Sequence, residues 1–324
     1  IIKYIAGAVS GDFIGLTSEG IQSYFDSFNA NKPIVFLFFL INFILNDAVI
    51  ILGVQKGIER VSKILIPILF VIMVIIIVFG LRLPGAMDGI TFLFRPDFSK
   101  FSMNSIITCL GQAFFALGLA MLGSMVFGSY IKEKDENIFK DSSVICLALV
   151  FAGILSGLMI LPIVFATGLT PGEGVGLTFL TLPLAFNVVP FGRILSILFY
   201  FGFYIAAFTS SVGVLEAIVG QFMERFKLER IKALMLASLI IIAIAALSIF
   251  YDPAFAFIDN VESNYILVIG CLLIALFSAR AWKMENLLEA ANIKSPFVRT
   301  WMNVSIKYIS PIVIVIIFFS QFIK

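Results

Sequence analysis

Long apolar stretches alternate with short polar connections along almost the whole chain. A membrane-spanning helix needs about 20 mostly apolar residues, and the chain contains eight segments of that kind. They are residues 34–53, 62–81, 105–130, 143–168, 191–222, 233–250, 260–279 and 305–323. This pattern predicts an all-α fold, a polytopic membrane helix bundle of about eight spanning helices.

The first 32 residues differ from the rest. Residues 1–13 are apolar and predict the end of a preceding helix, whereas residues 17–28 predict a short amphipathic helix in an extracellular segment. No linker, low-complexity tract or short tandem repeat divides the chain. We therefore expect residues 1–324 to form a single transmembrane domain, with the eight spans in residues 33–324.

Composition agrees with a bilayer location and excludes several classes of catalytic and binding site. Hydrophobic residues make up 61% and charged residues 13%, against about 45–50% and 25% in soluble domains, and the mean hydropathy is +1.10. The chain has no histidine, which excludes Ser-His-Asp triads, HExxH zinc sites and histidine proton relays. The formal net charge of +2 is too balanced for a nucleic-acid partner.

Lysine and arginine in the connections set the orientation, because cytoplasmic loops carry an excess of both. The loops after the first, third, fifth and seventh spans hold 14 of these residues. The alternate loops hold four, Arg82, Arg95, Lys100 and Arg193. We therefore expect the first set to face the cytoplasm and both chain ends to lie outside the cell inner (plasma) membrane.

Charged side chains within apolar spans are costly and begin as functional hypotheses. Asp47 follows Asn46 inside the first span, where pairing with a neighbouring helix or with Asn46 is at least as plausible as ion binding. Glu216 lies in the fifth span. Glu224 ends that span at the cytoplasmic side, where an ion pair with Arg225 or Lys227 is the simpler interpretation.

Three consecutive hydroxyl residues, Thr209, Ser210 and Ser211, lie in the fifth span. Hydroxyls in membrane helices often donate back to a carbonyl one turn earlier, and small residues also allow close helix packing. The alternative is a sodium site, since hydroxyls and freed carbonyls supply a compact oxygen shell without net charge.

Two glycine-rich regions leave similar choices open. The third span carries Gly111, Gly118, Gly123 and Gly128, which fit either close helix packing or a helix broken at mid-membrane beside a substrate cavity. Residues 168–192 form a glycine-rich hairpin with an apolar middle. It is either a re-entrant lid on the outer side or an ordinary surface loop.

These features in this order resemble the neurotransmitter:sodium symporter family, specifically its prokaryotic amino-acid transporters. The resemblance covers nearly the whole chain. The matching segments are residues 53–67 for the connection of the fourth and fifth family helices, 95–100 and 111–115 for the sixth, 128–130 for its end, and 207–211 for the eighth.

The resemblance implies a leucine-transporter-like fold, in which helices one to five and six to ten form inverted repeats. The eight spans then match family helices four to eleven, and residues 105–279 match the second repeat. The chain begins at Ile1 without a methionine, and the first two and most of the third family helix have no counterpart. Because the family needs its first helix for sodium and substrate, we expect this polypeptide alone not to transport.

The resemblance also implies site residues. Phe115 matches the aromatic residue that covers the substrate from outside. Four further positions match the substrate pocket, namely Gly118, Met121, Ser210 and Val214.

The resemblance implies half of the family's second sodium site, the half contributed by the eighth helix. Ala206, through its carbonyl, Thr209 and Ser210 correspond to the contribution of the eighth helix. Gly57 and Pro67, with nine residues between them, match a motif associated with unwinding of the fifth helix. Glycine loosens the backbone and proline removes a donor, so the physics agrees.

Two carboxylates match the gates. Asp259 corresponds to the outer gate and Glu224 to the inner gate, and both pair in the family with arginines of the N-terminal part.

Four positions depart from the family pattern. Ala116 stands where a hydroxyl usually contributes to the first sodium site, and Leu149 falls near the position of a seventh-helix amide or carboxylate. Ala120 and Leu122 replace the glycine pair of the unwound stretch. Each change removes an oxygen ligand or backbone freedom, so the alternative is a non-transporting, degenerate or truncated paralogue with a scaffold or assembly role.

The sequence predicts a sodium-coupled secondary transporter (symporter) of amino acids, and not an enzyme. Na+ is the expected co-transported ion, without an organic cofactor. The expected partners are the lipid bilayer and a small-molecule amino-acid substrate, with a homodimer as one arrangement.

Overall fold

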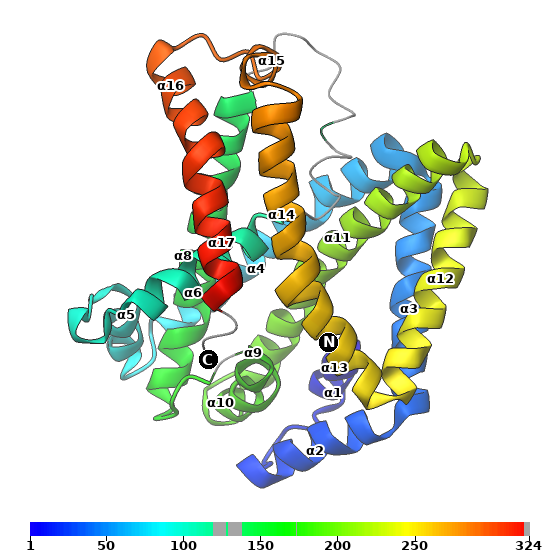
Figure 1. The fold of residues 1–324 in the computed structure, drawn as a ribbon. Coiled ribbons are helices and arrows are strands. Elements are labelled where there is room, and N and C mark those ends of the chain that lie inside the picture. The colour runs from blue at the N-terminus through cyan, green and yellow to red at the C-terminus, as the bar shows by residue number, and fades with distance from the viewer. Residues whose placement is uncertain (119–127, 129–137, 173, 321–324) are drawn as a thin grey trace. The chain divides into compact units, whose positions relative to one another are not determined.

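The computed structural model is helical (Figure 1) and describes residues 1–118, 128, 138–172 and 174–320, a part of the chain in which no strand forms. Six helices of that part are long and apolar enough to cross a membrane. They are α3 (Lys32–Ile51), Gly57–Gly80 (the end of η1, Val54–Glu59, with α4, Arg60–Gly80), α8 (Ile138–Ala166), α11 (Gly192–Phe226), α12 (Arg230–Phe250) and Pro296–Phe319 (α16, Pro296–Val304; η6, Ser305–Ile309; α17, Ser310–Ser320). Each overlaps a predicted span.

The seventh predicted span, residues 260–279, is part of a longer, interrupted run of helix. It contains α13 (Asp252–Val261), η4 (Glu262–Ile266), α14 (Leu267–Leu276), η5 (Phe277–Ala281) and α15 (Met284–Ala290). The axis bends by 99° between Ala281 and Met284. Lys283, the N-cap of α15, has φ of 67° and ψ of 134° there, a conformation that a regular helix does not contain.

The third predicted span, residues 105–130, is not one unbroken helix. α6 (Met103–Ala116) ends with a turn in which Gly118 has φ of 61°. Glycine adopts this left-handed conformation at little cost because it has no Cβ. The helix is therefore interrupted at Gly118, while the substrate cavity beside it stays a prediction; Ala120, Met121 and Leu122 lie outside the described residues.

The chain forms two compact units, Ile1–Pro96 with Ala152–Phe250, and Asp97–Phe151 with Tyr251–Lys324. The second unit also contains η2 (Phe98–Lys100). The remaining helices of the first unit are α1 (Ile2–Ser10), α2 (Ser18–Ala30), α5 (Ala86–Phe94), α9 (Gly174–Gly176), η3 (Leu177–Thr181) and α10 (Leu182–Val188). The single transmembrane domain stays a prediction.

α11 is the central helix of the first unit and packs against α1, α3, α4, α10 and α12. Figure 1 shows α3 and α12 lying side by side, as their contacts require. The two apolar clusters along α11 contain, at the α1 end, Tyr4, Phe13, Ile72, Leu182, Phe186, Phe199 and Tyr200, and at the α12 end Phe43, Ile50, Phe208, Val212, Leu215, Val219 and Leu234. These contacts fix the orientation of α11, the helix that carries the hydroxyl run.

The first 32 residues form the two predicted helices. Thr17 caps α2 by accepting a hydrogen bond from the Gly20 N–H at 3.3 Å, as N-cap threonines do. The Tyr24 hydroxyl donates to Asp12 at 3.3 Å. Burial raises the pKa of Tyr24 above its ordinary value, and the negative charge and hydrogen bond of Asp12 add to the rise.

Much of the glycine-rich hairpin at residues 168–192 is helical. Residues Gly174–Val188 form a short apolar helix made of α9, η3 and α10. Leu182, Ala185 and Phe186 are buried against the rest of the first unit. The Tyr4 and Tyr200 hydroxyls donate to backbone carbonyls of η3 at 3.2 and 2.8 Å. An irregular surface loop would not bury these side chains.

Candidate ion and substrate site on α11

One turn of α11 brings the Ala206 carbonyl oxygen together with the hydroxyl oxygens of Thr209 and Ser210. The Thr209 hydroxyl donates to the carbonyls of Ile205 at 3.0 Å and Ala206 at 3.1 Å, and the Ser210 hydroxyl donates to the Ala206 carbonyl at 3.0 Å. Each hydroxyl oxygen keeps two lone pairs while it donates its hydrogen. The back-bonding expected of membrane helices is therefore present, and the same oxygens stay available to a hard cation.

Ser211, the third hydroxyl residue, serves a different purpose. It donates to the Asn46 side-chain oxygen on α3 at 2.8 Å and to the Phe208 carbonyl at 2.9 Å. The Asn46 amide in turn donates to the Asn42 carbonyl at 2.8 Å, and Asn46 is only 2% exposed. Ser211 therefore fixes α11 to α3, on a different face of α11 from Ser210.

Ser210 and Val214 share one face of α11, because residues four apart lie above one another on a helix. Both are exposed, and Val214 is 50% exposed. Val212 and Leu215, on other faces, are buried. The exposed face combines one hydroxyl with one apolar side chain.

The other predicted substrate residues belong to the second unit. Phe115 lies in the last turn of α6 and Gly118 in the turn that follows. Met121 lies outside the described residues.

Glu216, inside α11, forms an ion pair with Arg230, the first residue of α12. The two guanidinium nitrogens Nη1 and Nη2 donate to the two carboxylate oxygens at 3.1 and 2.5 Å. The Arg230 Nε donates to the Ile50 carbonyl at the end of α3 at 2.9 Å. Glu216 has a fully buried side chain, so this bidentate pair compensates a charge that burial would otherwise destabilise.

Asp47 also pairs with a neighbouring helix. Its carboxylate oxygens accept from the Ser238 hydroxyl of α12 at 3.2 and 3.1 Å. One turn earlier on α3, Asn42 accepts from the Tyr204 hydroxyl of α11 at 3.1 Å. α3 is thus joined by polar contacts to both α11 and α12.

The two candidate gate carboxylates are exposed. Glu224 lies near the end of α11 and forms no ion pair with a described residue, Arg225 and Lys227 included. Asp259 lies in α13 and belongs to the second unit. The expected ion pair of Glu224 with its sequence neighbours is therefore wrong, and its carboxylate is accessible.

Gly57 and Pro67 lie at the start of the second spanning helix. Gly57 is in the π-helical segment η1, and Pro67 is inside α4. A Cβ on Gly57 would lie 2.1 Å from the Val49 carbonyl oxygen, so the connection from α3 closes only around a glycine. Both residues interrupt regular helix, as their chemistry predicts.

Sequence reasoning missed the partners of the buried polar groups. The sequence analysis counted Arg230 only among the positive charges of a cytoplasmic loop. An arginine at the start of one span, after a span that contains a lone carboxylate, could have indicated this ion pair. Asn46 and Ser238 gave no sequence signal of pairing, because their partners Ser211 and Asp47 are 165 and 191 residues away.

The fold and this site define a polytopic helical membrane protein with polar groups inside its spans. The model of the sodium:neurotransmitter symporter family matches residues 25–324. The chain is 31% identical to an uncharacterized sodium-dependent transporter of Haemophilus influenzae, covering 99% of this chain and 74% of the relative. It is 33% identical to the sodium-dependent transporter YhdH of Bacillus subtilis, with the same coverage.

A solved structure has a fold similar to that of this chain. The crystal structure of MhsT in complex with L-phenylalanine has a TM-score of 0.84 and 30% sequence identity, and covers 98% of this chain and 75% of that chain. The chain belongs to the sodium:neurotransmitter symporter family. It is a multi-pass membrane protein of a transporter family rather than an enzyme.

Proposed function

We propose that the protein is a sodium-coupled symporter of amino acids in the cell inner (plasma) membrane. Family membership and the sodium-dependent relatives support the ion. The similarity to a protein crystallised with L-phenylalanine supports an amino acid as substrate. The observation that carries the proposal is the oxygen cluster on one turn of α11, formed by the Ala206 carbonyl and the hydroxyls of Thr209 and Ser210.

In this proposal the oxygen cluster contributes to a site for the co-transported sodium ion. Hydroxyl and carbonyl oxygens suit a hard cation, and sodium in such transporters is held by backbone carbonyls near broken helices. Ser210 has a second role, because it shares its exposed face with Val214. An apolar contact beside a hydroxyl suits an amino acid with an apolar side chain. Phe115, Gly118 and Met121 stay the other proposed substrate residues, on the resemblance to the family.

The conformational cycle uses the remaining proposed residues. Asp259 acts in the outer gate and Glu224 in the inner gate, which is consistent with the exposure of both carboxylates. The irregular helix at Gly57 and Pro67 would open the inner side and release sodium. A homodimer stays a prediction, which cross-linking in membranes can test.

Uptake of labelled amino acids by cells expressing the complete gene that encodes this chain tests the proposal, because residues 1–324 alone are expected not to transport. We expect uptake that requires sodium, and Ser210→Ala should raise the sodium concentration for half-maximal uptake about tenfold, because an interaction with a charge contributes about 1.5–3 kcal/mol. Ser248→Ala is the matched control, since Ser248 also back-bonds, to the Ile244 carbonyl at 2.9 Å, and lies on α12. Expression without sodium-dependent uptake would instead favour the non-transporting paralogue.

A further inference from the structure

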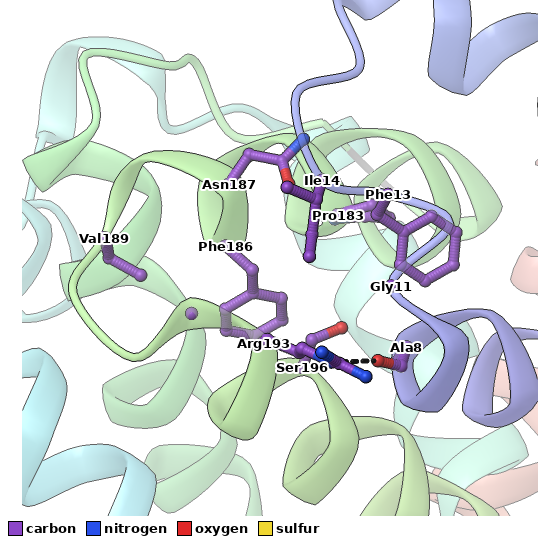
Figure 2. Close-up of a pocket in the computed structure, with 11 residues that line it drawn as sticks. Ala8, Gly11, Phe13, Ile14, Pro183, Phe186, Asn187, Val189, Arg193 and Ser196 are labelled. Atoms are coloured by element: carbon purple, nitrogen blue, oxygen red, sulfur yellow. Dashed lines mark hydrogen bonds between the residues drawn. The ribbon is translucent and has the colours of Figure 1, made fainter.

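A cavity of about 110 Å³ lies in the first unit, away from the hydroxyl run. Its walls are the end of α1 and the turn that follows, α10, and the first turn of α11 (Figure 2). The positive-charge distribution of the loops places this end of α11 on the outer side of the membrane. None of the residues proposed for sodium or substrate lines it.

Ser196 gives the cavity an unsatisfied hydroxyl. Its residue is 3% exposed, and its oxygen has no hydrogen-bond partner. Other helix hydroxyls behave differently: Ser143, Ser156 and Ser248 each donate to the carbonyl four residues earlier at 2.7–2.9 Å. A buried polar group without a partner costs about 1–3 kcal/mol, so a hydroxyl that lines a cavity in this state indicates a ligand.

Arg193 supplies a positive charge beside this hydroxyl. Its Nε donates to the Ala8 carbonyl at 3.4 Å and its Nη2 to the Val9 carbonyl, which caps α1. Its Nη1 makes no hydrogen bond, and no carboxylate pairs with it, in the described part of the chain. The nearby carboxylate of Asp12 is bonded to Ser10 and Tyr24 and does not line the cavity.

The start of α11 adds to the positive potential. Arg193 is its second residue, and Phe191 caps the helix without a side-chain hydrogen bond, so the positive end of the helix dipole faces this region. The start of α11 approaches α10 closely, and this requires a glycine, because a Cβ on Gly192 would lie 1.6 Å from the Phe186 carbonyl oxygen. These features together favour an anion.

The rest of the wall is mostly apolar, with one further polar side chain, Asn187, whose amide nitrogen donates to the Leu16 carbonyl at 3.3 Å. Phe13, Ile14, Pro183, Phe186 and Val189 line the cavity, and Figure 2 shows these side chains around the same space as Arg193 and Ser196. An apolar cavity of about 150 Å³ accommodates benzene, so this smaller one suits about five non-hydrogen atoms. The occupant therefore combines one negative group with a short apolar tail.

We propose that this cavity is a binding site for a short-chain monocarboxylate that enters from the outer side. Arg193 and Ser196 donate hydrogen bonds to its carboxylate, and Phe186 and Pro183 contact its alkyl group. The site carries no negative lining group that would hold an ammonium, which separates its ligand class from the amino acids of the proposed transport function.

Binding of labelled propionate to the purified protein in sodium-free, low-chloride buffer tests this site. We expect saturable binding that Ser196→Ala weakens about five- to tenfold and Arg193→Gln at least tenfold. The matched control is Arg82→Gln, since Arg82 is exposed and lies outside the cavity lining. Ser196→Ala should keep or raise the melting temperature without ligand, because it removes an unsatisfied hydroxyl.

Three results would overturn the proposal. They are absence of saturable binding by the unmodified protein, equal affinity in Ser196→Ala, and equal competition by propionamide or chloride, which lack the carboxylate. Because the measurement is made without sodium, any of these results leaves the proposed transport function untouched. Loss of sodium-dependent uptake would, in turn, leave propionate binding unaffected.

Discussion

At the scale of single residues, the ion pair of Glu216 and Arg230 is the group most sensitive to substitution. Arg230→Ala leaves the fully buried Glu216 carboxylate without its bidentate partner. We expect a loss of about 3 kcal/mol, the lower end for a broken buried pair, because the Arg230 side chain is 23% exposed. Thermal unfolding in detergent should show a melting temperature lower by several degrees.

Lys232→Ala is the matched control for that substitution. Lys232 pairs with Glu229 at 3.2 Å, but the two side chains are 66% and 79% exposed, so the pair contributes little. An equal effect of both substitutions would contradict the assigned role of the buried pair. The double variant Glu216→Leu with Arg230→Met should be nearer to the unmodified protein than Arg230→Ala, because it removes both charges.

The neighbouring hydroxyl groups of Ser210 and Ser211 on α11 should have different functions. Ser211→Ala removes the hydrogen bond to Asn46, and we expect a stability loss of about 1 kcal/mol. Its sodium dependence should stay unchanged, because Ser211 faces α3. Sodium titration of uptake together with thermal unfolding checks both parts, and a raised sodium requirement in Ser211→Ala would show that the hydroxyl face is wrongly assigned.

At the scale of secondary-structure elements, the entry to the second spanning helix depends on Gly57. A methyl group there would meet the Val49 carbonyl oxygen at 2.1 Å, so Gly57→Ala must displace the connection from α3. We expect a cost of about 1–3 kcal/mol, typical of overpacking, seen as a lower melting temperature.

Gly153→Ala tests whether any added methyl group has this effect. Gly153 lies inside α8, and an added Cβ would contact nothing within 4 Å. Alanine favours a helix by about 1 kcal/mol over glycine, so this variant should be as stable as the unmodified protein or more so. Destabilisation by both variants would argue against the steric explanation for Gly57.

Two helix interruptions show where the local sequence predicts the structure and where it does not. The interruption after Ala116 follows from a glycine at 118, which the sequence displays. The 99° bend before α15 has no glycine or proline; instead Lys283 adopts a backbone conformation with φ of 67°. Such a conformation is costly for lysine and persists only where surrounding packing determines it, so local sequence gave no sign of it.

At the scale of the whole molecule, the orientation in the membrane is open to direct measurement. In a cysteine-free background, Met87→Cys between the second and third predicted spans should react with an impermeant thiol reagent from outside. Lys294→Cys should react only after the membrane is permeabilised, because its loop is rich in positive charge. Both positions are exposed, so the reverse result would overturn the orientation and place the Arg193 cavity on the cytoplasmic side.

Local sequence was enough to predict the helical spans, the hydroxyl run at 209–211, the family and an expected orientation in the membrane. Hydrophobic length and loop charge act locally, on each segment's own contact with lipid or water, and need no partner. Three features required the folded structure: Ser211 bonds to Asn46, Glu216 pairs with Arg230, and Ser196 lines a cavity beside Arg193. The pairing of a polar group depends on which side chains packing brings within about 3 Å, and most of these partners are far apart in the chain.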